Sequence, residues 1–249
     1  MTMLELQRIG HSFFGRKVLD AISLSVGAGE IVALVGPSGS GKSTIAHIAA
    51  GVVDAREGRV VRRYHRHTMV FQDPRLMPWA TARDNIGFPL RLAGVGRGGR
   101  DGAIRAAALR AGLLPEDLDK YPSELSGGMR QRTAIARALV TDPDFIYFDE
   151  PFTALDVALK RRMQDLVIEA AASAHFAALF ITHDLSEAIR ISHRILVLDA
   201  NGRGIAGARI LPGAPGSRDD AAVFALRQRF LTEDPLFARI HDIDERLRP

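Results

Sequence analysis

The chain carries two kinds of hydrophobic pattern. Residues 4–9 and 22–26 alternate apolar and polar side chains, which predicts two half-buried antiparallel strands. Short apolar runs typical of buried strands recur at 31–35, 69–71, 145–148, 178–181 and 195–198. Helical stretches are predicted at 45–50, 103–114, 129–140, 155–172 and 185–191. This alternation predicts an α/β fold with a mostly parallel sheet, in which ligand-binding groups gather at the carboxyl ends of the strands.

Two segments interrupt the alternation. Residues 91–102 contain five glycines and predict a flexible break. Residues 56–67 carry five arginines and two histidines against one acid, Glu57. This basic run predicts a solvated edge strand of an antiparallel sheet, because charge discourages further strand pairing. A patch that binds anionic surfaces is the alternative.

The last part of the chain follows a Pro/Gly-rich link at 211–219. Residues 220–248 predict two short helices, and their apolar stripe consists of Leu236, Ile240, Ile243 and Leu247. We expect these helices to pack on the chain's own surface rather than on a partner.

Composition narrows the possibilities only slightly. A length of 249 residues suits one large domain, or one domain with a small appendage. The net charge of +4 is too small to require a nucleic-acid partner, and the lack of cysteine is compatible with a reducing compartment. No run approaches the roughly 20 apolar residues of a membrane span, and the first residues show no signal-peptide pattern. If the protein acts at a membrane, we therefore expect it to bind a partner there from the cytoplasmic side.

Residues 36–44 read GPSGSGKST and lie between an apolar run and a helical stretch. The spacing G-x-x-x-x-G-K-[ST] in this setting predicts a phosphate loop, whose backbone N–H groups and helix start converge on one anion. Lys42 is expected at the β- and γ-phosphates, and the Ser43 hydroxyl at Mg²⁺. The stretch therefore predicts binding of a nucleoside triphosphate by Gly36, Pro37, Ser38, Gly39, Ser40, Gly41, Lys42, Ser43 and Thr44.

Acidic and imidazole side chains follow two later apolar runs. Asp149 is expected to hold Mg²⁺, and Glu150 to polarise the attacking water. His183 can hydrogen-bond the γ-phosphate from the end of the next strand. Paired acids also occur at ordinary helix starts, and a lone histidine is often structural. The phosphate loop upstream favours the catalytic interpretation.

Ser126, Gly127 and Gly128 begin the predicted helix at 129–140 and form a second candidate anion site. Ser126 is placed to cap this helix, and an ordinary N-cap without an anion is the alternative. Two separate phosphate-binding helix starts predict a dimer, in which the second site of one subunit covers the nucleotide of the other.

Together these motifs resemble the ATP-binding subunit of ABC transporters, from about Leu4 to Leu198. The LSGG stretch at 125–128 is the most specific element, because other phosphate-loop proteins lack it. The resemblance implies an ABC-type P-loop NTPase fold with an antiparallel β subdomain and a helical subdomain that carries the signature. The ABC domain would span 1–211, with the helical subdomain at about 73–140, and 212–249 would form a C-terminal helical tail. The matching motifs are 36–44, Gln72, 125–132, 148–151, 154–156 and 182–184.

The resemblance also implies residue roles. Phe13 would stack on adenine, with Phe14 a close rival. Gln72 would touch Mg²⁺ or the attacking water and sense the transmembrane subunit, and Asp156 would lie at the dimer interface. Ser126 to Gly128 would bind the γ-phosphate of the opposite subunit's ATP. The implied activity is hydrolysis of ATP to ADP and phosphate by a homodimer, with Mg²⁺.

A narrower resemblance rests on residues 70–79 and 84–87, which look like those of importers for nitrate, sulfonates, taurine or bicarbonate. It implies a transmembrane permease that contacts the stretch Gln72–Trp79, and a periplasmic or extracellular solute-binding protein as an indirect partner. The subunit would sit at the cytoplasmic face of the plasma (inner) membrane, with no nucleic-acid partner. A Trp79 packed into its own chain is the alternative to a partner contact.

Other classes fit less well. An exporter or lipid-transporter subunit shares the catalytic motifs, but the loop at 74–79 argues against it. DNA-associated ABC ATPases place long coiled coils between the phosphate loop and the signature, and residues 45–124 are too few for them. A module that only binds nucleotide is disfavoured by Glu150 and His183. The sequence does not identify the transported solute or the permease.

Overall fold

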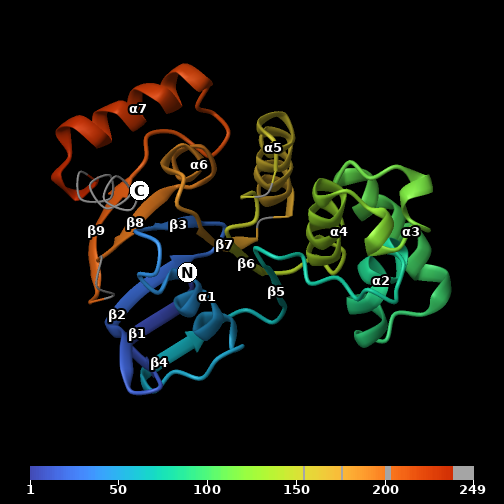
Figure 1. Cartoon of the computed structure of the whole chain (residues 1–249), viewed down its shortest axis with the longest axis horizontal. Helices are drawn as coiled ribbons and strands as arrows, with labels where there is room; N and C mark the ends of the chain where they lie inside the picture. Colours follow the sequence, from blue (N-terminus) through green and yellow to red (C-terminus); the bar gives the residue numbers. More distant parts are fainter. Residues whose placement is uncertain (154, 175, 200–202, 238–249) are drawn as a thin grey trace. The chain divides into compact units, whose positions relative to one another are not determined.

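The computed structural model describes residues 1–153, 155–174, 176–199 and 203–237. The chain folds into two compact units (Figure 1): Met1–Tyr64 with the described residues from 176 onward, and His65–Ala174. Ala154 and the stripe positions Ile240, Ile243 and Leu247 lie outside the described residues.

The first unit begins with an antiparallel sheet. Strand β1 (Thr2–Phe13) pairs with β2 (Arg16–Gly27) on one side and with β4 (Glu57–Arg62) on the other. The predicted antiparallel strands and the edge position of the basic run are confirmed. Both residues of the β1–β2 turn have positive φ, 47° at Phe14 and 80° at Gly15, as a two-residue hairpin requires.

The second sheet of this unit contains strands at three of the predicted apolar runs, 31–35, 178–181 and 195–198. Strand β3 (Ile31–Val35) lies parallel to β7 (Ala177–Ile181) and to β8 (Arg194–Leu198), between the two. All five residues of β3 and of β7 are buried. An additional strand, β9 (Ile205–Ile210), runs antiparallel to β8, and the hydrophobic pattern did not predict it.

Among its described residues, the first unit has three helices: α1 (Lys42–Ala50), α6 (Leu185–Ile191) and α7 (Asp220–Glu233). Helix α7 lies beside α6 (Figure 1), and its Val223 and Phe230 join one buried cluster with Ala188 and Ile189 of α6. Phe237 stacks on Phe230 with ring centroids 4.6 Å apart. The first of the two predicted tail helices and its packing on the chain's own surface are therefore confirmed.

The second unit combines a strand pair with a group of helices. Strand β5 (His67–Val70) runs parallel to β6 (Phe145–Asp149), and α5 (Val157–Ala174) follows β6. Its other elements are α2 (Ala82–Leu92), α3 (Arg97–Arg110), α4 (Gly127–Leu139) and the 3-10 turns Pro115–Asp117 and Pro122–Glu124. Helices α2, α3 and α4 gather around a shared apolar cluster (Figure 1).

The flexible break predicted at 91–102 is wrong. Helix α2 continues to Leu92, and α3 begins at Arg97, six residues before the predicted start at Ala103, and contains three of the five glycines. Burial explains the difference, since Ile104, Ala107 and Ala108 of α3 pack into the cluster with Ile86 and Leu90 of α2. That packing outweighs the roughly 1 kcal/mol that each glycine costs a helix. Asp101 also pairs with Arg83 at 2.7 Å and with Arg105 at 2.8 Å.

Candidate functional site

The phosphate loop joins the buried strand β3 to helix α1. The Lys42 side chain is 5% exposed, and its Nζ donates to the carbonyl oxygens of Gly36, at 2.8 Å, and Pro37, at 2.9 Å. These bonds hold the ammonium inside the curve of the loop. The first turn of α1 carries no acidic side chain, so its backbone N–H groups and positive helix end remain available to an anion. The buried Ser40 hydroxyl, 3% exposed, has no hydrogen-bond partner among the described residues.

Gly41 precedes α1 with φ of 98°, a backbone conformation that side-chain-bearing residues rarely adopt. A Cβ at this position would lie 2.6 Å from Leu19 Cδ2 and 3.3 Å from Val18 Cγ1, both on β2. The loop therefore rests directly on the antiparallel sheet, and glycine is required here for both torsion and space.

Two cavities open in the first unit. One, of about 600 Å³, reaches the phosphate loop at Gly39 and is lined mainly by β2 residues, with three cationic side chains and one acid. Lys17 in its wall pairs with Asp20 at 2.6 Å. Its lining residues are Arg16, Lys17, Val18, Leu19, Asp20, Gly39 and Arg203.

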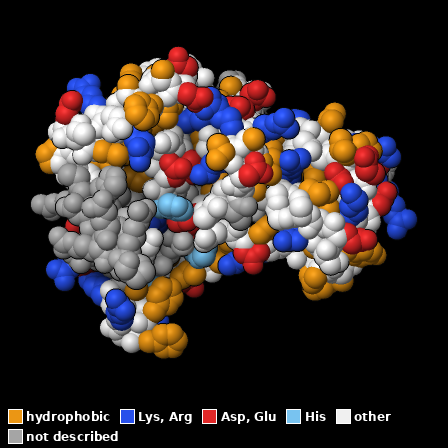
Figure 2. Space-filling model, turned by 45° about the horizontal axis from the view of Figure 1, so that its top comes forward, with side chains coloured by type: hydrophobic (Ala, Val, Ile, Leu, Met, Phe, Trp, Pro, Cys, Tyr) orange, Lys and Arg blue, Asp and Glu red, His pale blue; other side chains and the backbone are white. Residues whose placement is uncertain are grey.

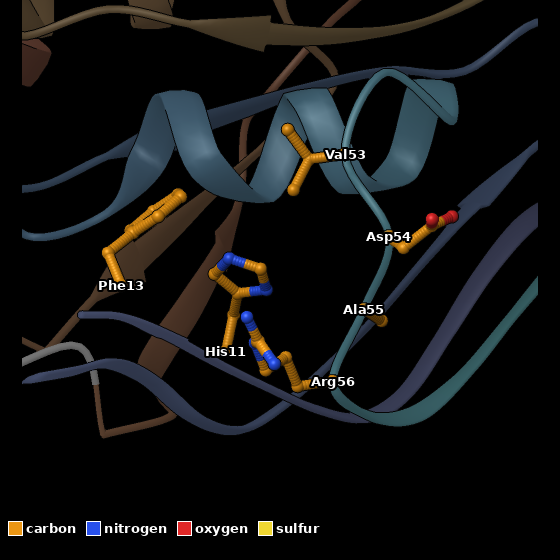
Figure 3. A pocket seen from close by; sticks show the side chains of 6 residues that line it. All are labelled: His11, Phe13, Val53, Asp54, Ala55 and Arg56. Atoms are coloured by element: carbon orange, nitrogen blue, oxygen red, sulfur yellow. The ribbon is translucent and has the colours of Figure 1, made fainter. Parts of the chain in front are cut away.

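The other cavity, of about 490 Å³, lies between the end of β1 and the connection from α1 to β4 (Figure 3). The His11 ring stands between Phe13 and Arg56 and makes an edge contact with the Phe13 ring, at 4.5 Å between centroids. His11 is 5% exposed, and its Nδ1 has no hydrogen-bond partner in the described chain. The cavity thus offers an aromatic wall and polar groups to a flat ligand, through His11, Phe13, Val53, Asp54, Ala55 and Arg56.

The end of β7 leads into α6 through Thr182, His183 and Asp184. Asp184 caps α6 by accepting hydrogen bonds from the backbone N–H groups of Ser186, at 2.8 Å, and Glu187, at 3.3 Å. The buried Thr182 hydroxyl donates to Glu187 Oε2 at 2.6 Å. His183, between these two anchored residues, is exposed, so its imidazole is presented to solvent from a fixed backbone.

In the second unit, β6 ends at Asp149, which is 5% exposed, and Glu150 follows with φ of 46°. A left-handed conformation at a residue other than glycine costs about 1–2 kcal/mol, and such strain concentrates at functional positions. The Thr153 hydroxyl donates to the Glu150 carbonyl at 3.2 Å and lies 3.4 Å from its carboxylate Oε2. Thr153 thus contacts both the backbone and the carboxylate of Glu150.

Ser126 caps α4, since its hydroxyl accepts from the Met129 N–H at 3.2 Å. The prediction of an N-cap at Ser126 is confirmed, and α4 begins at Gly127, two residues before the predicted start. A Cβ on Gly128 would lie 2.5 Å from Leu159 Cδ2 of α5, so the helix start packs closely on α5. Arg130 donates to the carbonyl of Leu125 at 2.7 Å and steadies the turn ahead of the cap.

The stretch from Gln72 to Trp79 is a loop held by two buried or half-buried side chains. Arg137 of α4 donates to the carbonyls of Pro74, at 2.7 Å, and Arg75, at 3.0 Å. Asn85, fully buried in α2, accepts from the Met77 N–H at 2.8 Å and donates to the Met77 carbonyl at 3.2 Å. Trp79 is 77% exposed, so its ring does not pack into its own chain.

The candidate residues are thus shared between the two units. The first unit holds Phe13, residues 36–44 and His183, and the second holds Gln72, Ser126–Gly128, Asp149, Glu150 and Asp156. Asp156 lies at the start of α5, where its carboxylate accepts from the Leu159 N–H at 2.9 Å. Sequence reasoning did not single out His11, Asp54 and Arg56 as cavity residues, nor Arg137 and Asn85 as loop anchors.

The residues predicted to hold Mg²⁺ carry oxygen donors. Ser43, Gln72 and Asp149 offer a hydroxyl, an amide and a carboxylate, the hard ligands that Mg²⁺ accepts. In the part of the chain that the structure describes, no cluster of three or more His, Cys, Asp or Glu residues could hold a metal by itself.

Comparison with known proteins gives consistent matches. A family model described as ABC transporter matches residues 19–153. The taurine import ATP-binding protein TauB of Sinorhizobium fredii is 40% identical over 240 residues, which cover 90% of this chain and 85% of that protein. The aliphatic sulfonates import ATP-binding protein SsuB of a Mycobacterium species is 40% identical over 231 residues, which cover 93% of both chains.

Solved structures also resemble the chain. A dimeric post-hydrolysis structure of the ATP-binding cassette MJ0796, bound to ADP and Pi, matches with a TM-score of 0.76 and 28% identity. The match covers 85% of this chain and all of that one. A second dimeric structure of MJ0796, described as a bacterial ABC transporter cassette, matches with the same TM-score and 29% identity.

Proposed function

This chain belongs to the ABC transporter family and is an ATP-hydrolysing subunit, and we propose that it energises import of a small sulfonate-class solute through a membrane permease. The observation that carries the solute class is 40% identity, over at least 90% of the chain, to ATP-binding proteins for taurine and aliphatic sulfonate import. Nitrate or bicarbonate is the alternative solute class within the same group of importers.

The first unit would hold the triphosphate. Backbone N–H groups at the start of α1 would bind the phosphates, and Lys42 would place its charge at the β- and γ-phosphates. The Ser40 hydroxyl, buried without a partner, would gain one there. Cations of the cavity at Gly39 would favour the negative charge electrostatically.

Hydrolysis would depend on residues from both units. The Glu150 carboxylate would accept a proton from the attacking water, and its strained, fixed backbone supports that role. His183 would donate a hydrogen bond to the γ-phosphate. Mg²⁺, when bound, would neutralise charge on the transferred phosphate, and Ser43, Gln72 and Asp149 would hold it directly or through water.

The signature would complete the site from a second subunit. Ser126, Gly127 and Gly128 offer backbone N–H groups at the start of α4 to the γ-phosphate of the partner's ATP. Asp156 would lie at the same homodimer interface. The dimeric MJ0796 structures support this arrangement, since they match the chain over 85% of its length.

The permease would contact the loop from Gln72 to Trp79 at the cytoplasmic face of the inner membrane. An exposed tryptophan on a loop anchored by Arg137 and Asn85 supports this assignment, because aromatic anchors dominate protein interfaces.

No helix among the described residues is long and apolar enough to cross a bilayer. On the face drawn in Figure 2, cationic and acidic side chains are interspersed, which fits a protein partner better than nucleic acid. A solute-binding protein outside the membrane would act through the permease.

Phe13 rather than Phe14 would form the adenine wall, because Phe13 lines the cavity in Figure 3 and Phe14 is fully exposed at the hairpin tip. Stacking of one base on an aromatic ring contributes about 1–3 kcal/mol. We therefore expect Phe13→Ala to raise the KM for ATP roughly tenfold with kcat little changed. Steady-state ATPase kinetics measure both, with Phe14→Ala as the matched control. Equal KM values for the two variants would remove Phe13 from the base site.

Reconstitution tests the function as a whole. The chain would be purified with its permease, placed in lipid vesicles, and assayed for ATP hydrolysis with solute-binding protein and taurine, an alkanesulfonate, nitrate or bicarbonate. We expect the sulfonates to stimulate hydrolysis. Stimulation only by nitrate or bicarbonate would overturn the solute class, and failure to recover any membrane partner would overturn the transport role.

The same preparation tests the permease contact. Loss of one aromatic anchor from an interface commonly costs about 2 kcal/mol, on the order of thirtyfold in affinity. We expect Trp79→Ala to lower recovery of the permease to that extent, with an unchanged melting temperature. Leu109→Ala removes another exposed apolar side chain of the same unit and serves as the control. Normal recovery with Trp79→Ala would place the permease contact elsewhere.

A further inference from the structure

Arg218 is a buried cation in the link before α7, and its hydrogen bonds go to backbone carbonyls. It is 5% exposed. Its Nε donates to the Pro212 carbonyl at 2.8 Å, and its Nη2 to the Gly213 carbonyl at 2.9 Å. Its Nη1 reaches the last turn of α6, with the carbonyls of Ile189, Arg190 and Ser192 as acceptors.

The guanidinium thus joins two segments that are distant in sequence. Carbonyls at the end of a helix lack partners within the helix and carry partial negative charge, so a cation there is favourable. Burial lowers the pKa of Arg218, which shows that the charge is removed from water at a cost. The planar fork of arginine bridges several acceptors at once, which a lysine ammonium does with less geometric precision. The carbonyl oxygens offset the cost of burying the charge. Because one guanidinium bonds both segments, it holds the link next to the end of α6.

His183 lies just ahead of the opposite, N-terminal end of α6. Asp184 caps the helix, and the Thr182–Glu187 bond ties the preceding residue to its first turn. Helix α6 is only seven residues long, or about 10 Å, and Ala188 and Ile189 pack in the core under α7. A shift at the Arg218 end therefore moves a short helix whose other end begins at Leu185, two residues after His183.

We propose that Arg218 is a positioning residue for hydrolysis, through which the C-terminal tail sets the place of His183. The inference rests on the proposed role of His183 at the γ-phosphate. Arg218 touches no reacting group itself. It acts through α6, and displacement of a catalytic group by about 1 Å can reduce a rate by up to a hundredfold.

A double-mutant cycle in the full-length chain tests this role. Arg218→Ala is expected to lower kcat for ATP by about tenfold to a hundredfold, with the KM for ATP changed less than about twofold. Arg218→Lys should recover part of the loss, because it keeps the charge. In a His183→Ala background, Arg218→Ala should have no additional effect on the residual rate, which is followed over hours with labelled ATP. Arg229→Ala, on the exposed face of α7, is the control and should keep the normal kcat.

The outcomes distinguish the proposed role of His183 at the γ-phosphate from the positioning role of Arg218. A normal kcat in His183→Ala would remove the proposed role of His183, and the positioning role with it. A low kcat in His183→Ala together with an independent, multiplicative loss from Arg218→Ala would overturn the positioning role alone. A normal kcat in Arg218→Ala would do the same. Melting temperatures set the assay temperature for each variant, and if Arg218→Ala does not fold, the cycle is run with Arg218→Lys.

Discussion

Glu150→Gln is expected to abolish ATP hydrolysis and to trap an ATP-bound dimer. The amide keeps the shape of the carboxylate but cannot accept the proton of the attacking water. Removal of a general base commonly costs a factor of about 10²–10⁴ in rate. Binding should survive, because the phosphate loop and the signature are unchanged. Phosphate release measures the loss, and size-exclusion chromatography with and without ATP measures the dimer.

The left-handed backbone at Glu150 strengthens this expectation. The backbone at Glu150 is left-handed, with φ of 46°, and its carboxylate lies 3.4 Å from the Thr153 hydroxyl. Glutamine therefore has the same backbone constraint, and the variant isolates the chemical change. Glu169→Gln, on the exposed surface of α5 in the same unit, is the control and should hydrolyse ATP normally. Full turnover by Glu150→Gln would exclude this residue as the base.

Local sequence patterns predicted the parts of the fold that depend on short-range physics. The buried strands β3, β6, β7 and β8 were predicted because each is a continuous apolar run. The Ser126 cap was predicted because its function needs only a hydroxyl next to a helix start. The phosphate loop was predicted as a motif, but the contact of Gly41 with β2 was not, since Leu19 and Gly41 are distant in sequence.

Errors arose where tertiary packing decides the local structure. Glycine-rich residues 97–102 are helical because α3 buries Ile104, Ala107 and Ala108 against α2, which a propensity argument does not include. Strand β9 alternates half-buried and exposed residues and contains alanine and glycine, so its hydrophobic signal is weak. Pairing with β8, rather than its own composition, makes it a strand.

The candidate site shows the same division. Lys42, Glu150 and His183 stand in motifs and could be selected from sequence. Arg137 and Arg218 could not, because their role is to bond carbonyl oxygens that any residue supplies. Such anchors leave no spacing pattern, although they hold the loop from Gln72 to Trp79 and the link before α7 in place.

Gly41→Ala is expected to abolish nucleotide binding. Alanine at φ of 98° is strained by about 1–2 kcal/mol, and its Cβ would lie 2.6 Å from Leu19 Cδ2. Leu19 is fully buried and cannot move away without disturbing the sheet, so the loop must shift instead. A shifted loop no longer directs its N–H groups at one point, and the anion loses several charge-assisted hydrogen bonds of about 1.5–3 kcal/mol each. Fluorescent ATP titration is the measurement, with an expected loss of at least about a hundredfold in affinity.

Gly29→Ala is a control for alanine at positive φ without a clash. Gly29 also has positive φ, 67°, but a Cβ there would meet no atom within 4 Å. Both variants therefore carry the torsional cost, and only Gly41→Ala carries the clash with β2. Because Gly29 lies outside the phosphate loop and its Cβ would meet no atom, Gly29→Ala should bind ATP normally, with a slightly lower melting temperature. Equal affinities of the two variants would show that the contact with Leu19 does not shape the loop.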